Sequence, residues 1–286
     1  MASIRFGTDG WRAIIARDFT YANLRIVAQG IASYINSGSG LGKSVVIGFD
    51  NRFMSSEFAQ ECASILAGNG IKVHLLKNSA PTPLVAFAVR HLQCDGGIVI
   101  TASHNPAYYN GVKFIPAYAG PATPEETQAI ESEIQRVAEG AKVYEIDLKD
   151  AVHLDLIDEI EMEKAYFNHL DKIVQRDYIK AAHLKVVIDP MYGAGIGFLE
   201  NYLTGLGIEV KAIHSHRDVL FGNTVPEPVE RNLSDLRRAV ISYNAGIGLA
   251  LDGDADRFGL VDHEGRFISG NQFISLLLHH LLATRT

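Results

Sequence analysis

The sequence predicts an α/β protein made of two consecutive three-layer α/β/α domains, each with a mixed, mostly parallel sheet. Its 286 residues suit two domains of ordinary size. Short β-branched runs alternate with segments of helical spacing in both halves of the chain, which is the pattern of βαβ units. In each half, one buried run leads directly into a polar loop, at the strand end where α/β folds carry their active sites.

The first half alternates predicted helices with predicted strands. Apolar residues at helical spacing predict helices after Thr20, after Ser55 and after Thr123. The last helix begins with Thr123, Pro124 and Glu126, which supply an N-cap, a first-turn proline and a capping-box glutamate. Apolar and β-branched runs predict buried strands over residues 45–49, 71–76, 96–101 and 112–115.

The second half repeats this rhythm after a charged, aperiodic stretch over residues 142–158, where we place the connection between the domains. Helices are expected over residues 160–174, 198–206 and 234–243, and strands over residues 185–189, 208–213, 246–251 and 258–262. An apolar helical stretch, residues 274–282, follows close to the end of the sequence and is interrupted by His279 and His280.

Composition and charge exclude several classes of protein. With 47% hydrophobic and 21% charged residues, the chain is neither disordered nor of low complexity. Its net charge of −7 argues against a nucleic-acid partner. The N-terminal segment does not resemble a signal peptide, and no apolar run reaches the ~20 residues of a membrane span. Cys62 and Cys94 lack disulfide or zinc spacing, so we expect buried free thiols and a cytoplasmic protein.

The segment DGDADR, residues 252–257, places three carboxylates at alternate positions directly after a predicted strand. Asp252, Asp254 and Asp256 would repel one another without a cation among them, so the segment predicts a Mg²⁺ site. It is not an EF-hand, because Arg257 stands where that loop needs glycine and His263 where it needs glutamate. The alternative is a solvated turn without metal.

The segment TASHNP, residues 101–106, places Ser103 at the C-terminal end of a predicted buried strand, which makes Ser103 the candidate nucleophile. The frame G-x-S-x-G of hydrolases is absent, and His104 is poorly placed as a triad base because it is the next residue. A turn capped by Ser103 and Asn105 before Pro106 is the structural alternative.

Two basic residues are further candidates. Lys113 lies in the next predicted strand and either reaches back toward Ser103 or is exposed; the sequence leaves both open. Arg12 follows Trp11, which is the one tryptophan of the sequence. Because a tryptophan is costly to expose, we expect a packed loop that aims Arg12 inward.

A glycine cluster follows the predicted strand over residues 185–189. Gly193, Gly195 and Gly197 suggest a dinucleotide-binding loop, but Phe198 stands where the last glycine of G-x-G-x-x-G should fall. We therefore expect a tight strand-to-helix turn at this position.

Taken together, these motifs resemble those of the α-D-phosphohexomutase family. The matching text is FGTDGWRA (residues 6–13), TASHNP and YNGVKF (residues 101–106 and 109–114) and DGDADR (residues 252–257). The resemblance implies that Ser103 carries a transferable phosphoryl group and, with Asp252, Asp254 and Asp256, binds Mg²⁺. It further implies that Arg257 binds substrate and that Arg12, His104 and Lys113 support charge neutralisation and proton transfer. The implied substrates are a hexose phosphate and a hexose 1,6-bisphosphate, between whose positions 1 and 6 phosphate is moved.

The resemblance also implies a domain division. It predicts a first domain over residues 1–150 with the phosphoserine loop and a second over residues 151–268 with the metal loop. Residues 269–286 would be the first helix of a third domain. Family members have four domains, so the sequence is interpreted as an incomplete N-terminal part that needs domains III and IV for full activity.

Three other functions are considered. Phosphoglucosamine mutase is the second substrate choice, although Trp11 favours the glucose or mannose branch, where the amino-sugar branch usually has isoleucine. The second alternative function is that of a non-catalytic, metal-binding scaffold with the same fold. The third is a phosphatase that uses an aspartyl nucleophile of the acidic loop.

Overall fold

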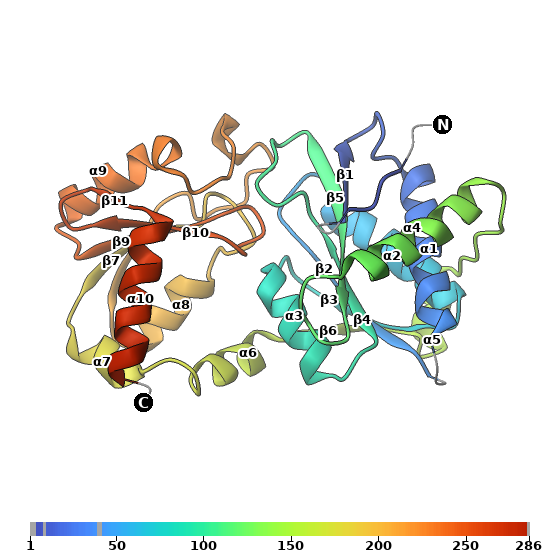
Figure 1. Ribbon diagram of the computed structural model, residues 1–286, viewed down its shortest axis with the longest axis horizontal. Coiled ribbons are helices and arrows are strands. Elements are labelled where there is room, and N and C mark those ends of the chain that lie inside the picture. The colour runs from blue at the N-terminus through green and yellow to red at the C-terminus, as the bar shows by residue number, and fades with distance from the viewer. Residues whose placement is uncertain (1–3, 8–9, 39–41, 285–286) are drawn as a thin grey trace.

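The computed structural model describes residues 4–7, 10–38 and 42–284 of the chain. They form two α/β units that lie side by side along the longest axis (Figure 1). Each unit has one sheet between helical layers, which confirms the predicted class of two α/β domains with mixed sheets. Thr8 and Asp9 of the first motif lie outside the described residues.

The first unit has a six-stranded sheet in the order β1-β5-β4-β2-β3-β6. The strands β4, β2, β3 and β6 are parallel, while β5 and β1 are added antiparallel at one edge. The strands are β1 (Trp11–Ile14), β2 (Ser44–Phe49), β3 (Lys72–Leu76), β4 (Gly96–Ile100), β5 (Tyr109–Pro116) and β6 (Ile157–Ile160). The helices are α1 (Tyr21–Ser37), α2 (Ser55–Gly68), α3 (Thr82–His91), α4 (Pro124–Ala138) and α5 (Leu148–His153).

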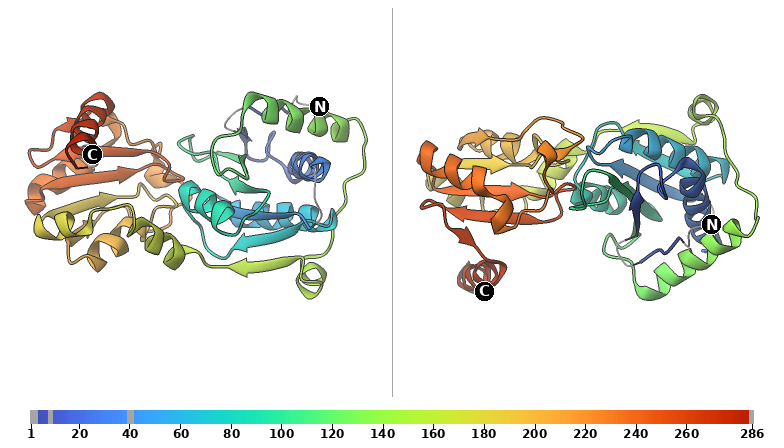
Figure 2. Two further views of the ribbon diagram at one scale, coloured as in Figure 1. Left: turned by 60° about the horizontal axis from the view of Figure 1, so that its bottom comes forward. Right: turned by 90° about the horizontal axis from the view of Figure 1, so that it is seen from above.

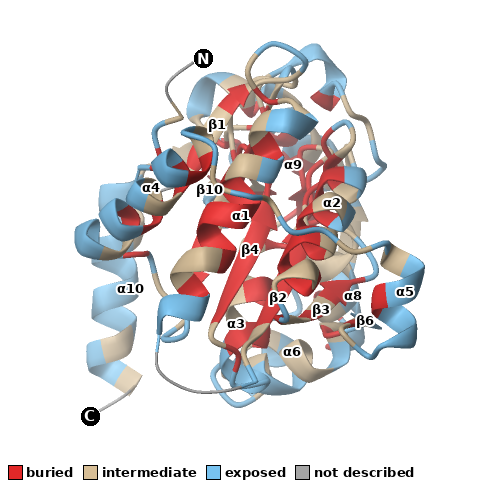
Figure 3. Ribbon diagram, turned by 90° about the vertical axis from the view of Figure 1, so that its right-hand side faces the viewer, coloured by how far each residue is buried: buried red, intermediate tan, exposed pale blue. Residues whose placement is uncertain are grey.

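Both faces of this sheet are buried, because its central strands are apolar on both sides. Val45 and Ile47 of β2 belong to the core with α1, α2 and α4, whereas Val46 packs with α3 on the other face. Figure 3 shows α1, β2 and β4 as the buried centre of the unit. The packing is close: a Cβ on Gly30 of α1 would lie 2.5 Å from the side chain of Ile134 in α4.

The second unit has a five-stranded sheet in the order β11-β10-β9-β7-β8. Helix α9 covers one face, and α7 and α8 cover the other. The strands are β7 (Lys185–Asp189), β8 (Glu209–Ala212), β9 (Ile247–Leu251), β10 (Phe258–Asp262) and β11 (Phe267–Ile268). The helices are α6 (Glu163–Leu170), α7 (Arg176–Ala181), α8 (Phe198–Gly205), α9 (Ser234–Tyr243) and α10 (Gly270–Thr284), with short 3-10 turns at Phe221–Asn223 and Glu230–Asn232.

The first sheet extends beyond the expected boundary at residue 150. Strand β6 lies in the expected connection, yet it pairs in parallel with β3 as the edge strand of the first sheet. Its sequence IDEI is half charged, because one side of an edge strand faces solvent, and this hid its strand character. The expected helix over residues 160–174 is the shorter α6, so the sheet of the first unit ends at residue 160.

Two further elements differ from expectation. The packed loop expected around Trp11 is strand β1, which pairs antiparallel with β5 and places Trp11 opposite Val112. Trp11 is buried and stacks on Phe19 with ring centroids 4.9 Å apart. Helix α3 was not expected; it tolerates Pro83 because proline costs no hydrogen bond in a first turn.

The expected apolar C-terminal helix is confirmed as α10. Its side chains Ile274, Leu276, Leu278 and Leu282 are exposed, and the helix projects from the second unit in both views of Figure 2. Phe273 contacts Phe258 of β10, with ring centroids 4.8 Å apart. Within the described ranges, none of the helices has the length and apolar character needed to cross a membrane. The role of α10 as the start of a third domain stays a prediction.

The contact between His214 and Asp189 predicts how stability depends on pH. His214 Nδ1 lies 3.1 Å from the buried carboxylate of Asp189, and this hydrogen bond, with the charges of Asp189 and Asp235, raises the pKa of His214 despite burial. A raised pKa in the folded state stabilises the protein below the unfolded pKa and is lost as pH rises through the folded value. His214→Gln should therefore lower the free energy of unfolding by about 1 kcal/mol at about pH 5.5 and by less at about pH 8.5.

Urea unfolding at several pH values measures this difference. His263→Gln is the control, because 67% of the His263 side chain is exposed. A destabilisation by His214→Gln that is the same at both pH values would contradict the prediction.

Candidate active site

The serine loop begins where β4 ends and holds Ser103 in a strained conformation. Ser103 is 1% exposed and has φ of 52°, in the left-handed region that a residue with a side chain seldom adopts. Its backbone N–H donates to Thr101 Oγ1 at 2.8 Å. Its Oγ donates to Asp252 Oδ2 at 3.1 Å and lies 3.3 Å from His104 Nδ1. The nucleophile predicted from the sequence thus faces the predicted metal loop, although 149 residues separate Ser103 from Asp252.

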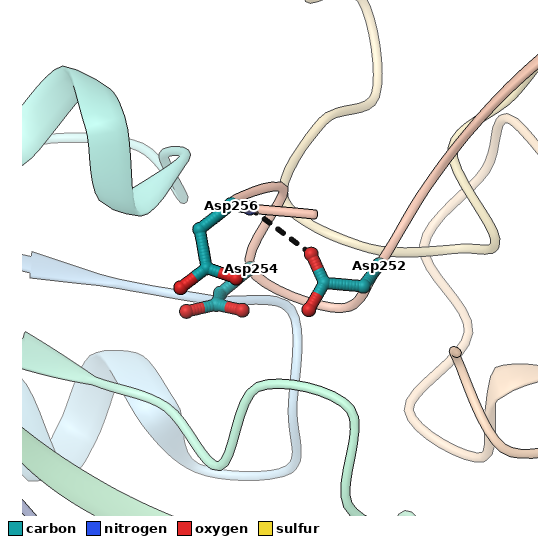
Figure 4. A group of neighbouring side chains, drawn as sticks. All are labelled: Asp252, Asp254 and Asp256. Atoms are coloured by element: carbon teal, nitrogen blue, oxygen red, sulfur yellow. Dashed lines mark hydrogen bonds between the residues drawn. The ribbon is translucent and has the colours of Figure 1, made fainter. Parts of the chain in front are cut away.

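The acidic loop connects β9 to β10 and gathers its three carboxylates. One ligand oxygen from each of Asp252, Asp254 and Asp256 lies within 4.8 Å of the others, and Figure 4 shows the three carboxylates side by side. Asp252 and Asp254 are fully buried. Asp252 Oδ1 accepts the backbone N–H groups of Asp256 and Arg257, each at 3.0 Å, which leaves its Oδ2 for Ser103.

The electrostatics of this loop favour a bound cation. Burial, reinforced by the charges of Asp254 and Asp256, raises the pKa of Asp252 to about 8. Asp254 Oδ1 is buried and has no hydrogen-bond partner among the described residues. A buried carboxylate oxygen without a donor is costly, and a hard cation held among the three clustered carboxylates would satisfy it. The residues present therefore fit a Mg²⁺ ion, with Ser103 Oγ as a further oxygen at the same place.

Lys113 reaches the acidic loop from β5. Its Nζ donates to Asp254 Oδ2 at 2.7 Å and to Asp256 Oδ2 at 2.8 Å. Burial lowers the pKa of Lys113, but the two carboxylates outweigh burial, and the pKa is raised. The alternative of an exposed lysine is therefore wrong: only 12% of the side chain is exposed.

The other predicted site residues surround the serine loop. Arg12 Nη1 donates to Asn105 Oδ1 at 2.9 Å, so Arg12 lies against this loop as expected. Burial, followed by the charges of Arg257 and Arg12, lowers the pKa of His104. Arg257 is the most accessible of the group, with 48% of its side chain exposed and its Nε 4.0 Å from Asp256.

Sequence reasoning missed three residues that hold these loops. Asp50 and Arg52 follow β2 as a buried ion pair, with Arg52 Nε 3.1 Å from Asp50 Oδ2. Thr82, at the start of α3, donates its N–H to the carbonyl of Asp254 at 2.9 Å and its hydroxyl to the carboxylate at 2.7 Å. A usable signal was present for Asp50 and Arg52, because they follow a predicted buried strand at the end where α/β sheets carry their sites.

Two glycines set the distance between the loops. A Cβ on Gly253 would lie 2.4 Å from the carbonyl oxygen of Ser103, and a Cβ on Gly193 would lie 2.8 Å from the carbonyls of Asp252 and Gly253. Asn51 Nδ2 donates to the carbonyl of Gly193 at 2.7 Å, which ties this turn to the first unit. The turn at Gly193 is tight as expected, and it packs against the acidic loop.

Two family models match the chain. The description "Phosphoglucomutase/phosphomannomutase, alpha/beta/alpha domain I" covers residues 3–141, and that of domain II of the same family covers residues 164–265. The chain belongs to the phosphoglucomutase/phosphomannomutase family. The resemblance inferred from the sequence motifs is thereby confirmed, and the unmatched residues between the two models contain β6.

Named relatives carry several mutase names. A phosphoglucomutase from Staphylococcus saprophyticus is 32% identical over 97% of this chain and 52% of its own length. A protein from Methanosphaera stadtmanae, named as a phosphoglucosamine mutase, is 33% identical over 95% of this chain and 58% of its own length. The chain thus spans about half the length of the curated relatives that it matches.

A solved structure agrees with the fold of this family member. The structure of a protein from Thermus thermophilus, named as a phosphomannomutase, superposes with a TM-score of 0.89 at 37% identity. The match covers 99% of this chain and 62% of the other. Both α/β units and their arrangement therefore match those of that protein.

The Gly253 contact predicts a strong effect of a single methyl group. Gly253→Ala would drive a Cβ into the carbonyl of Ser103, a backbone atom that cannot rotate away, and should cost about 1–3 kcal/mol of unfolding free energy. Ala255→Gly is the matched control in the same loop. Ala255 has φ of 55°, in the left-handed region that glycine adopts without strain. Relief of that strain offsets the extra entropy of glycine, so this change should cost less than about 0.5 kcal/mol. Urea unfolding of both variants checks the contrast, and equal destabilisation by the two changes would refute it.

Proposed function

We propose that this chain performs phosphoryl transfer between Ser103 and a hexose phosphate, as part of a phosphohexomutase of the phosphoglucomutase/phosphomannomutase type. The observation that carries the proposal is the 3.1 Å contact between Ser103 Oγ and Asp252 Oδ2, inside a cluster of three carboxylates. A serine hydroxyl at a hard-cation site is suited to accept and return a phosphoryl group.

Asp252, Asp254, Asp256 and Ser103 Oγ would hold Mg²⁺, which when bound neutralises negative charge on the transferred phosphoryl group. Phosphoryl transfer has a loose transition state with charge spread over its oxygens, so the protein contributes position and positive charge. Lys113, Arg12 and Arg257 supply further positive charge around Ser103.

The proton of Ser103 needs an acceptor as its oxygen attacks phosphorus. His104 was expected to be poorly placed as a base because it follows Ser103 directly, yet its Nδ1 lies 3.3 Å from Ser103 Oγ. Burial lowers the pKa of His104, which favours the neutral imidazole. In the tautomer with hydrogen on Nε2, Nδ1 can accept that proton. The Oγ–P bond of Ser103 then forms while a P–O bond of a hexose 1,6-bisphosphate breaks, and the departing sugar oxygen takes up a proton.

Glucose and mannose phosphates are the proposed sugars, with glucosamine phosphate as the alternative, since relatives carry all of these names. Trp11 packs in the core against Phe19, so its identity gives little support for one sugar over another. We also propose that steady turnover needs sugar contacts from protein outside these two units, because the chain covers 52% of the phosphoglucomutase relative. These contacts would come from the expected domains III and IV.

The location that we propose is the cytoplasm. Cys62 and Cys94 are buried free cysteines, as expected from the sequence. Burial raises the pKa of both thiols, which keeps them protonated and unreactive. This state fits a reducing compartment.

The first test is phosphorylation of Ser103 itself. Incubation of the chain with Mg²⁺ and glucose 1,6-bisphosphate should add one phosphoryl group, seen by intact-mass spectrometry, and glucose 6-phosphate should remove it. Ser103→Ala should abolish this uptake, while Ser56→Ala, a change of a serine at the start of α2, should leave it unchanged.

The alternatives give different results. A non-catalytic scaffold leaves Ser103 unmodified under every condition. A phosphatase with an aspartyl nucleophile keeps its activity in Ser103→Ala and loses it in Asp252→Asn. Either result would overturn the proposed function.

The second test concerns the metal. Asp254→Asn removes a charge from the buried oxygen pair and should weaken Mg²⁺ binding by about tenfold or more, measured by isothermal titration calorimetry. Asp158→Asn, on the edge strand β6, is the control and should leave Mg²⁺ affinity unchanged. Chelation with EDTA should stop phosphoryl uptake, and excess Mg²⁺ should restore it. Undiminished Mg²⁺ affinity in Asp254→Asn would exclude the acidic loop as the metal site.

A further inference from the structure

Arg52 lies directly behind the serine loop and is completely buried. Its side chain and that of Asp50 are both 0% exposed, and Arg52 Nε lies 3.1 Å from Asp50 Oδ2. Burying an ion pair costs desolvation energy that its attraction often fails to recover. Stability alone is therefore a weak reason for an arginine at this position.

The guanidinium of Arg52 binds the backbone of the serine loop at four points. Nη1 and Nη2 each donate to two backbone carbonyls. Together these four acceptors span the loop from Ser103 to Tyr109, the first residue of β5. The acceptors are the carbonyls of Ser103 at 2.6 Å, Asn105 at 2.6 Å, Pro106 at 2.8 Å and Tyr109 at 3.1 Å. A planar fork of donors makes these bonds together, and the single ammonium of lysine cannot reproduce them.

These bonds fix the two peptide groups on either side of Ser103 Cα. The N–H of Ser103 donates to Thr101 Oγ1, and this hydroxyl donates to Asp50 Oδ2 at 2.6 Å. The carbonyl of Ser103 accepts from Arg52. A non-glycine residue at φ of 52° is strained and persists only when its surroundings hold it. The Asp50–Arg52 pair supplies those surroundings on both sides.

The second unit is attached to the same arginine. The ring of Phe221 lies over Arg52 with its centroid 4.9 Å from Cζ, and Arg217 Nη2 donates to the backbone carbonyl of Arg52 at 3.5 Å. The carbonyl of Ser103 that accepts from Arg52 is also the atom that Gly253 of the acidic loop approaches. Arg52 therefore contacts the nucleophile loop and the unit that carries the carboxylates.

We propose that Arg52 is a positioning residue for phosphoryl transfer, which holds Ser103 in its left-handed conformation and sets its Oγ against Asp252. The inference rests on the proposed function for its kinetic consequence. Arg52 does not touch the reacting atoms; it acts through the backbone of Ser103. Its loss should slow the transfer step without removing the metal ligands, because Thr82 and Lys113 hold the acidic loop independently.

The test is Arg52→Lys, which keeps the charge and loses the fork. In a single turnover with Mg²⁺ and glucose 1,6-bisphosphate, the rate constant for phosphoryl uptake on Ser103 should fall about 100-fold, the effect of a small misplacement of a reacting group. The amplitude and the half-saturating concentration of bisphosphate should stay unchanged. A variant that is only partly folded would instead lose amplitude and keep its rate constant.

Arg237→Lys is the matched control. Arg237 Nε also donates to a backbone carbonyl, that of Gly265, but it lies on α9 in the second unit. This change should leave the rate constant unchanged. A rate constant for Arg52→Lys within about threefold of the unchanged protein would overturn the proposal. If Arg52→Lys does not fold, Asp50→Asn is measured in its place, and an unchanged rate constant there would overturn the proposal equally.

Hydrogen exchange separates this inference from the proposed function. In Arg52→Lys, backbone amides of residues 101–109 should exchange about tenfold or more faster than in the unchanged protein, while those of β7 and β9 keep their protection. If the unchanged protein takes up no phosphate, the proposed function fails, and this readout still decides the role of Arg52. Unchanged exchange of the loop would overturn that role.

Discussion

The site depends on a backbone contact between two loops from different sheets. At Gly253 the acidic loop comes so close to the carbonyl of Ser103 that a Cβ would lie 2.4 Å from its oxygen. This approach brings Ser103 Oγ within 3.1 Å of Asp252. A side chain at this point would hold the loops apart, so the main chain itself sets the distance between Ser103 and the carboxylates of the acidic loop. Gly193, Asn51 and Thr82 all hold the acidic loop in that place.

The positive charge of Lys113 is shared unequally among the three carboxylates of the acidic loop. Lys113 binds Asp254 and Asp256, and it makes no hydrogen bond to Asp252 among the described contacts. Asp252 is buried beside Ser103, and its pKa is raised by that burial and by the charges of Asp254 and Asp256. Lys113 thus compensates the three carboxylates unequally and leaves Asp252, in contact with Ser103, without an ion pair among the described contacts.

The sequence revealed the parts of the site whose chemistry lies within a few residues. The spacing of Asp252, Asp254 and Asp256 and the polar turn at Ser103 are local features, and both were found. Arg52 and Thr82 were missed, because their partners lie 51 and 172 residues away and are met only through the fold. The edge strands β1 and β6 were missed for another reason: they are short, and two residues of β1 and three of β6 are not buried, so their patterns are weak.

The topology explains why neither unit makes the site alone. In the first sheet β2 and β4 are parallel neighbours, so Asp50 and Thr101 emerge side by side at their carboxyl ends and hold the serine loop. In the second sheet the carboxyl end of β9 supplies the carboxylates. The two ends must face each other for the site to form. Helix α6 supports this arrangement with aromatic contacts: the ring centroids of Tyr166 and Phe87 lie 5.5 Å apart, and those of Phe167 and Phe198 lie 6.0 Å apart. With polar bonds at one end and aromatic packing at the other, the interface between the units determines the distance between Ser103 and Asp252.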